Sequence, residues 1–132
     1  AQTLGLADQV PCRGHCNDVP GLLKGHQICV LSTHYEGMPL SLIEGMAAGC
    51  AVVGSQVVGV QEVVDSGRTG LLVEHANPQA LADALATLLN QPQDAARMAA
   101  AAHAEVLQRY GLNTMTDRYE ALLGSLLEKP VL

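Results

Sequence analysis

Two glutamates, Glu36 and Glu44, stand eight positions apart in a segment that is otherwise rich in apolar and small residues, 32–49. An unpaired carboxylate is costly among apolar neighbours, so this placement argues for a ligand more strongly than the spacing alone. A carboxylate accepts hydrogen bonds from hydroxyl groups, and its two oxygens suit the two hydroxyls of a cis-diol. The simpler alternative is that both glutamates are solvated positions on a loop and a helix.

The residues between the two glutamates favour the binding of an anion. Gly37 allows a ligand to approach the backbone closely, and Pro39 is tolerated in the first turn of a helix. The amides expected to point outward there are those of Met38, Leu40 and Ser41. Such a helix N-terminus binds phosphate, and Glu44 follows one helical turn later. The order of carboxylate, amides and carboxylate matches the hydroxyls, pyrophosphate and ribose diol of a nucleotide sugar.

A parallel sheet is expected to position these groups. Continuous apolar runs predict buried strands at residues 28–31, 51–53 and 70–73, and residues 10–13 are a further extended candidate. Helical patterns occur at residues 19–24, 40–48 and 60–65, then from Pro78 onward, at 95–110, and from 113 or 114 to 127. This alternation predicts an α/β fold, a Rossmann-like parallel sheet with flanking helices. The loops at 32–39 and 54–59 each follow a strand, so both should open on the ligand-binding edge of the sheet.

Composition and charge exclude several other classes of function. The chain has 132 residues, of which 48% are hydrophobic, and a net charge of −6. An acidic surface repels phosphate backbones, and the sequence has no Phe or Trp on which bases could stack, so we expect no nucleic acid partner. The glycine signatures of dinucleotide-binding and ATP-hydrolysing proteins are missing, as is the G-x-S-x-G nucleophile motif.

The four cysteines, Cys12, Cys16, Cys29 and Cys50, match no zinc signature. Cys29 and Cys50 lie in apolar runs, where buried thiols act as small hydrophobic groups, so no metal is expected. Residues 1–4 have neither a charged start nor an apolar stretch, and no segment is long enough to span a bilayer. We therefore expect a cytoplasmic protein.

The segment around the two glutamates resembles the signature of family-four retaining glycosyltransferases, enzymes of the two-domain GT-B fold whose motif is two glutamates separated by seven residues. The resemblance continues in order through residues 49–53, 58–64, 67–73 and 77–82, and upstream through 10–14 and 18–20. It therefore covers nearly the whole chain. It implies one truncated half of a GT-B architecture, with residues 1–132 as a partial C-terminal donor-binding domain.

The resemblance also implies roles for individual residues. Glu36 would act as the catalytic residue that contacts hydroxyls of the transferred sugar near the anomeric centre, and Glu44 would hold the ribose. The remaining substrate-binding positions would be Gly37, Met38, Pro39, Leu40 and Ser41 along the sugar and pyrophosphate, Gly14, His15 and Asn17 near the base, and Gly59 beside the cleft. The donor would be a nucleotide diphosphate sugar, with no cofactor and no metal. Glu62 would serve as a structural cap, and His34 is either a plain loop residue or a ligand contact.

The chain departs from the family pattern in three places. Gly45 replaces the usual Ala after the second glutamate and would loosen the helix slightly, and Cys50-Ala51 replaces a basic residue and Pro. An Arg and a Lys that hold the pyrophosphate would precede Ala1, as would the acceptor-binding N-terminal domain. We therefore expect a fragment that is inactive alone. Any association with the membrane would occur through the absent domain. The sheet of the fragment would expose an edge that invites self-association.

Two alternatives remain open at this stage. One is a nucleotide-sugar-binding or interaction module with no catalytic role, although such a module need not keep both Glu36 and Glu44. The other is a sugar epimerase or phosphorylase of the same fold, which shares part of the glutamate pair.

Overall fold

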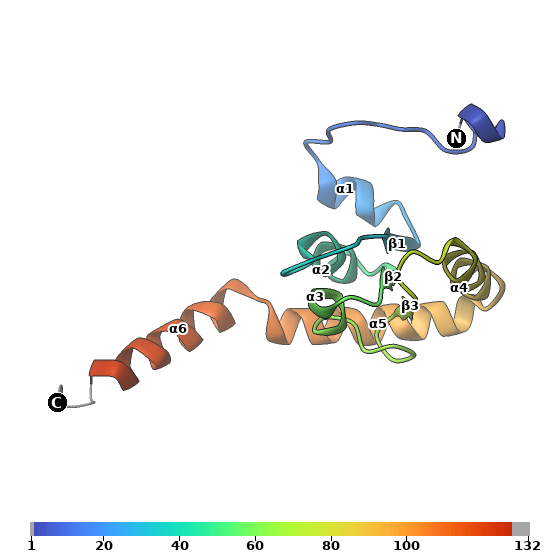
Figure 1. Cartoon of the computed structure of the whole chain (residues 1–132). Helices are drawn as coiled ribbons and strands as arrows, with labels where there is room; N and C mark the ends of the chain where they lie inside the picture. Colours follow the sequence, from blue (N-terminus) through green and yellow to red (C-terminus); the bar gives the residue numbers. More distant parts are fainter. Residues whose placement is uncertain (1, 128–132) are drawn as a thin grey trace.

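The computed structural model describes residues 2–127, which form an α/β fold around a three-stranded parallel sheet. The strands are β1 (Ile28–Leu31), β2 (Ala51–Ser55) and β3 (Leu71–Val73), in the order β1-β2-β3 (Figure 1). Ile28 pairs with Ala51, and Val53 pairs with Leu71. The predicted Rossmann-like sheet with flanking helices is confirmed.

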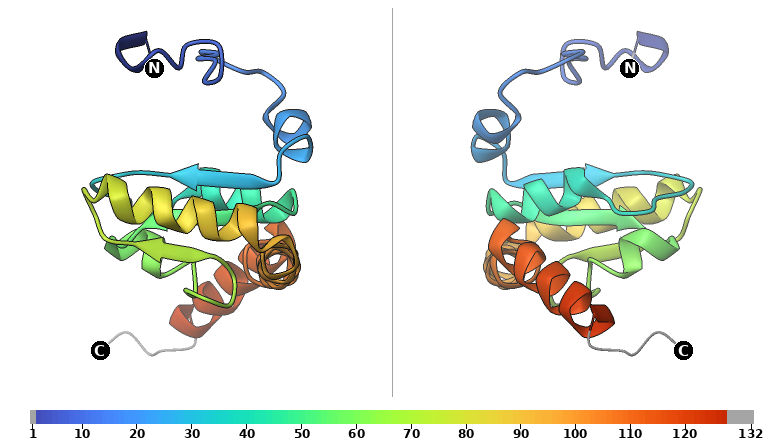
Figure 2. Two further views of the ribbon diagram at one scale, coloured as in Figure 1. Left: turned by 90° about the vertical axis from the view of Figure 1, so that its right-hand side faces the viewer. Right: turned by 90° about the vertical axis from the view of Figure 1, so that its left-hand side faces the viewer.

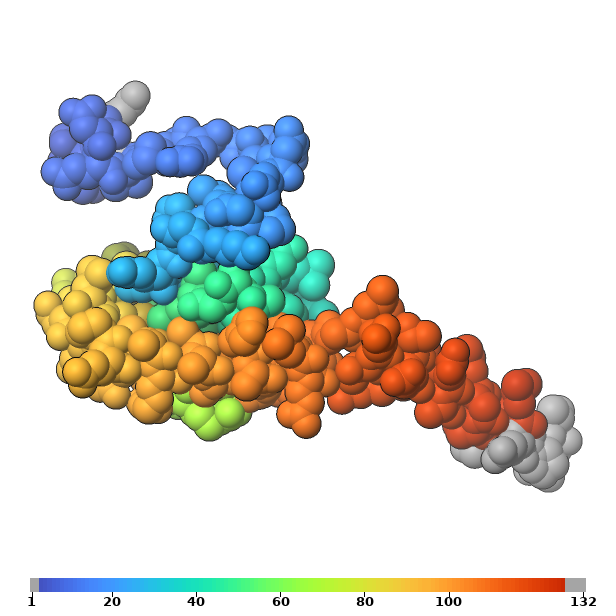
Figure 3. All heavy atoms as spheres, turned by 180° about the vertical axis from the view of Figure 1, so that it is seen from behind, coloured from blue at the N-terminus to red at the C-terminus, as the bar shows by residue number. Residues whose placement is uncertain are grey.

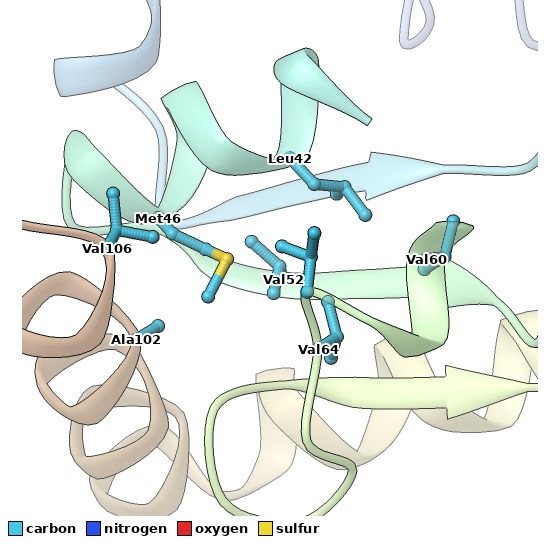
Figure 4. Close-up of a cluster of buried hydrophobic side chains, with 8 residues drawn as sticks. Leu42, Met46, Val52, Val60, Val64, Ala102 and Val106 are labelled. Carbon is cyan, nitrogen blue, oxygen red and sulfur yellow. The ribbon is translucent and has the colours of Figure 1, made fainter. Parts of the chain in front are cut away.

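One face of the sheet is covered by the two crossover helices, α2 (Leu40–Ala47) and α3 (Val58–Gln61). Figure 4 shows their buried side chains meeting Val52 of β2, together with side chains from the second half of α5 (Pro92–Arg109). The members of this cluster are Leu42, Met46, Val52, Val60, Val63, Val64, Ala102 and Val106. The helix that carries Glu44 is therefore held against the sheet by the buried side chains Leu42 and Met46.

A second cluster covers the opposite face. Ala51 and Val53 alternate with Val52 along β2, so they point to the other side of the sheet. There they pack with Leu88 of α4 (Pro78–Asn90) and with Met98 of α5. Two helical layers thus enclose β2, whose five residues are all buried.

Two helices begin at a side chain that caps the first turn. Asp18 Oδ1 accepts the Gly21 amide at 2.9 Å and begins α1 (Val19–Lys24). Asn77 Oδ1 accepts the Ala80 amide at 3.0 Å and begins α4, with Pro78 in the first turn.

Several boundaries differ from the sequence-based expectation, among them the end of α3 at Gln61 instead of residue 65 and the start of α5 at Pro92 instead of residue 95. Residues 10–13 form no strand, because they run apart from the sheet and have no partner strand there (Figure 2). β2 continues to Ser55, and α3 begins at Val58 instead of residue 60. The start of α3 has no side-chain cap, so no local signal marks it. Glu62 is the C-cap of α3, which agrees with a structural role.

The final helix, α6 (Leu112–Leu127), projects away from the body of the domain (Figures 1 and 3). Its large apolar side chains are exposed: Leu112, Met115, Tyr119, Leu122, Leu123, Leu126 and Leu127. No helix within residues 2–127 is both long and apolar enough to cross a membrane. An amphipathic helix with an uncovered apolar face is the most prominent unpartnered surface in the described part of the chain.

Candidate functional site

The loops that follow β1 and β2 meet at the carboxyl edge of the sheet, as expected. The Thr33 amide donates to Ser55 Oγ at 3.1 Å, which ties the start of the Glu36 loop to the end of β2. Ser55 is itself only 5% exposed, so this contact is part of the rigid frame.

Glu36 lies half-buried in the loop between β1 and α2. Within residues 2–127 its carboxylate makes no side-chain hydrogen bond or ion pair, and this leaves its oxygens available to a ligand. The backbone of the loop rests directly on Gly59. A Cβ atom on Gly59 would lie 2.3 Å from the Glu36 carbonyl oxygen and 2.4 Å from that of Gly37. Gly59 was predicted as substrate-binding, and the structure places it under the Glu36 loop as a buried backbone contact.

The N-terminus of α2 offers fewer free amides than the sequence suggested. Pro39 is the N-cap and its side chain is fully buried, so it shapes the turn from inside. The expectation that the Leu40 amide points outward unpaired is wrong, because it donates to the Met38 carbonyl at 2.9 Å across the tight turn. The amides of Met38 and Ser41 have no backbone acceptor within the described residues. The side chains of Met38 and Leu40 are 58% and 61% exposed.

Glu44 is exposed on the solvent side of α2, opposite the buried Leu42 and Met46. It borders a hollow of about 220 Å³ between α1 and α2, whose other walls include Val19, Leu23 and Lys24. The hollow is mostly apolar, and it lies beside a carboxylate that has no side-chain partner within residues 2–127. The contribution of α1 to it has no signal in the sequence.

The segment that contains Gly14, His15 and Asn17 lies outside this hollow. All three residues are exposed, Gly14 has a left-handed φ of +66°, and His15 Nε2 hydrogen-bonds Asn17 Oδ1 at 3.0 Å. Their expected role near the base stays a prediction.

Gly45 has a specific neighbour that the sequence does not reveal. A Cβ atom at Gly45 would lie 2.8 Å from both Cβ and Sγ of Cys29 on β1. Cys29 thus fills the space that an alanine would take, and helix α2 sits closer to the strand. Burial raises the pKa of the Cys29 thiol to about 11, with smaller contributions from Cys50 and from the carboxylate of Glu44. The thiol is therefore a neutral packing group at physiological pH.

A separate cavity of about 260 Å³ lies at the same edge of the sheet and is lined by loops after all three strands. His34 and His75, which stand 41 positions apart in the chain, meet there, and His34 Nδ1 is hydrogen-bonded to His75 Nε2. Sequence reasoning considered His34 alone and missed this pairing.

The parallel sheet with flanking helices is the fold of solved GT-B glycosyltransferases. Residues 1–91 match the family described as glycosyl transferases group 1, and the chain belongs to this family.

Individual relatives agree with this assignment. The chain is 37% identical over 109 residues to a D-inositol 3-phosphate glycosyltransferase of Streptomyces scabiei, covering 80% of this chain and 24% of that protein. It is 28% identical over 126 residues to the N-acetyl-alpha-D-glucosaminyl L-malate synthase of Bacillus anthracis, covering 96% and 33%. The chain therefore spans between a quarter and a third of the length of these relatives.

Solved structures match along nearly the whole chain. Anabaena HepE in complex with UDP superposes with a TM-score of 0.91 at 27% identity, covering 94% of this chain and 34% of HepE. HepE in complex with UDP-glucose gives a TM-score of 0.88 at 29% identity, with the same coverage.

Proposed function

We propose that this chain is the donor-binding part of a longer glycosyltransferase, which transfers a sugar from a nucleotide diphosphate sugar to an acceptor with retention of anomeric configuration. The observation that carries the proposal is the placement of Glu36 and Glu44. Glu36 lies in the loop after β1 at the carboxyl edge of the sheet, and Glu44 lies one turn into the following helix, α2. Neither carboxylate has a side-chain partner within residues 2–127.

The geometry supports the assignment of each part of the donor to a different group of the site. Glu36 contacts sugar hydroxyls near the anomeric centre, the Met38 and Ser41 amides face the pyrophosphate, and Glu44 holds the ribose diol. The hollow between α1 and α2 beside Glu44 takes the base. That HepE has been solved with UDP and with UDP-glucose supports a nucleotide donor for a related domain.

The pyrophosphate needs more positive charge than this region offers. A helix N-terminus carries roughly half an elementary charge, and Lys24 is the basic side chain that lines the same hollow as Glu44. We propose that basic side chains from elsewhere in the parent protein also bind the pyrophosphate, and that no metal ion is needed for transfer. Unchanged turnover of the full-length enzyme in a chelator would support this, and loss of turnover restored by Mg²⁺ would contradict it.

Two surfaces support a further domain or strand in the parent protein. The outer edge of β1 has no strand partner within residues 2–127, and α6 presents its apolar face to solvent. We propose that the acceptor-binding domain of the same polypeptide covers the α6 face. The isolated 132-residue chain should then self-associate through these surfaces at micromolar concentration. Sedimentation velocity over a concentration series tests this, and a monomer at every concentration would contradict it.

The donor assignment is tested with substitutions of each carboxylate in the full-length enzyme. Glu44→Gln should weaken donor binding, seen mainly as a higher KM, because a neutral amide cannot accept both ribose hydroxyls. Glu36→Gln should lower kcat, because it acts near the reacting carbon. Asp83→Asn on the exposed side of α4 is the matched control and should leave both constants unchanged.

The isolated chain provides a second test. It should bind UDP- or GDP-sugars weakly and turn over none, so robust transfer by the 132 residues alone would overturn the fragment interpretation. NMR of the product of the full-length enzyme reports the anomeric configuration. An inverted, epimerised or phosphorolysed product would assign a different reaction to the fold.

We propose a cytoplasmic location as well. All four cysteines are free thiols, which suits a reducing compartment. Fractionation of cells that express the full-length protein tests this, and recovery from an oxidising compartment would contradict it.

A further inference from the structure

Two imidazole rings meet in the cavity at the carboxyl edge of the sheet, and neither has a role in the proposed donor binding. His34 follows β1 and His75 follows β3, so the pair spans the end of β2 between them. Their ring centroids are 4.6 Å apart with the planes at 69°, and the facing atoms are His34 Nδ1 and His75 Nε2. Neither Glu36 nor Glu44 lines this cavity.

The backbone beside His75 is held in an uncommon conformation. Ala76 has a φ of +57°, a left-handed value that residues with a side chain rarely adopt. The turn is fixed by two contacts from Asn77, whose amide donates to the Glu74 carbonyl at 3.3 Å and whose Nδ2 donates to Glu74 Oε2 at 2.7 Å. This strained and tethered turn delivers the ring of His75 to the ring of His34.

Two neutral imidazole nitrogens that face each other use one lone pair and one N–H between them. The neutral ring that carries its N–H at the facing nitrogen can carry it at its other nitrogen instead. Both facing nitrogens then have a lone pair, and a transition-metal ion can bind both. Tetrahedral coordination at a metal–nitrogen distance of ~2.0–2.1 Å places the two nitrogens ~3.3 Å apart. Both rings are exposed, so a small outward rotation provides this separation.

We propose that His34 and His75 form a two-imidazole site for a divalent transition-metal ion such as Zn²⁺, Ni²⁺ or Cu²⁺. Imidazole favours these ions, whereas Mg²⁺ and Ca²⁺ prefer clusters of oxygen ligands. Residues 2–127 contain no group of three or more His, Cys, Asp or Glu side chains that could hold a metal ion, so water completes the coordination sphere. The carboxylate of Glu74 lines the same cavity and adds a favourable charge. The ion cross-links the loop after β1 to the loop after β3 and takes no part in the transfer step.

The test uses the 132-residue chain with Cys12 and Cys16 replaced by Ser, because these free thiols are at least partly exposed and would bind the same ions. Calorimetric titration with Ni²⁺ and with Zn²⁺ should show saturable binding of one ion per chain, a rise in Tm, and no binding of Mg²⁺. Acidification should release the ion, because protonated imidazoles have no lone pair to donate.

Substitution of either ligand separates this site from adventitious binding. His34→Gln and His75→Gln should each abolish the saturable phase and the Tm rise. His103→Gln and His26→Gln are matched controls, since each ring is bonded by Nδ1 to a backbone carbonyl, that of Ala47 or Leu22, instead of to a second histidine. The proposal is overturned if the wild-type binding survives His34→Gln or His75→Gln, or if the controls lower it equally. It is also overturned if no saturable binding is seen at neutral pH.

Discussion

Replacing Gly59 by Ala should displace the loop that carries Glu36. The new Cβ would lie 2.3 Å and 2.4 Å from two backbone carbonyl oxygens, whereas ordinary contacts begin near 3.4 Å. The loop must therefore retreat by roughly 1 Å, since neither oxygen can rotate away as a side chain would. Overpacking of this kind costs ~1–3 kcal/mol, and the helix propensity gained by Ala returns at most ~1 kcal/mol. We expect a net loss of about 1–2 kcal/mol in the free energy of unfolding.

Urea denaturation of the isolated chain measures this loss, and donor kinetics of the full-length enzyme measure its consequence. A shift of about 1 Å in Glu36 should lower kcat by up to ~100-fold, with a smaller change in KM. Gly124→Ala is the matched control, because a Cβ there meets open space on α6 and should leave stability unchanged or slightly raised. If Gly59→Ala unfolds at the wild-type urea concentration with unchanged kcat, the loop does not depend on this contact and the reasoning fails.

Three further predictions concern the frame of the site. Gly45→Ala should destabilise the chain by ~1 kcal/mol in urea denaturation, and by less in a Cys29→Ala background, where the Sγ contact is gone and the Cβ contact remains; equal costs in both backgrounds would refute the contribution of Sγ. Thr69→Val should cost ~1–3 kcal/mol, because fully buried Thr69 Oγ1 accepts the Asp65 amide at 2.9 Å, whereas Thr69→Ser should keep that hydrogen bond and most of the stability. The pKa of Cys29, about 11, exceeds the ordinary 9.0, so between these values the folded state retains a proton that the unfolded state loses. The free energy of unfolding should therefore fall as pH rises from 9 to 11 in the wild type, and it should fall less in Cys29→Ala. Urea denaturation at each pH measures this difference.

Local chemistry made much of the fold readable from the sequence. Asp18 and Asn77 bond the amides that their positions imply, and the three apolar runs became the three strands. The start of α3 was misplaced because Val57, its N-cap, makes no side-chain hydrogen bond. Instead, Gly59 of this helix packs against the backbone of the Glu36 loop and Val60 packs into the core, and both are tertiary contacts without a local signal.

The candidate site was predictable to the same degree. The glutamate pair and the edge on which its loops open follow from residue type and strand order, whereas the walls of each hollow do not. The space beside Gly45 is filled by Cys29 from another element, and His34 meets a ring that lies 41 positions later. Such pairings depend on the order of the strands in the sheet and on the conformation of each loop. The spacing of residues along the chain predicts neither the strand order nor the loop conformation.

The charges around the site bear on how the proposed donor is bound. Both glutamates are acidic, and the proposed nucleotide diphosphate sugar is negatively charged as well. Arg68 pairs with Asp65 and with Glu105 of α5, and Arg109 pairs with Glu105 within the same helix, so both cations already have acidic partners. Hydrogen bonds from Arg68 and Arg109 lower the pKa of the Glu105 carboxylate. The α2 terminus adds only about half a positive charge, and the turn at Met38 already uses one of its amides. In the proposed function, the carboxylate pair recognises hydroxyls on either side of the pyrophosphate and so selects the donor, and cations elsewhere in the parent protein supply the strength of binding.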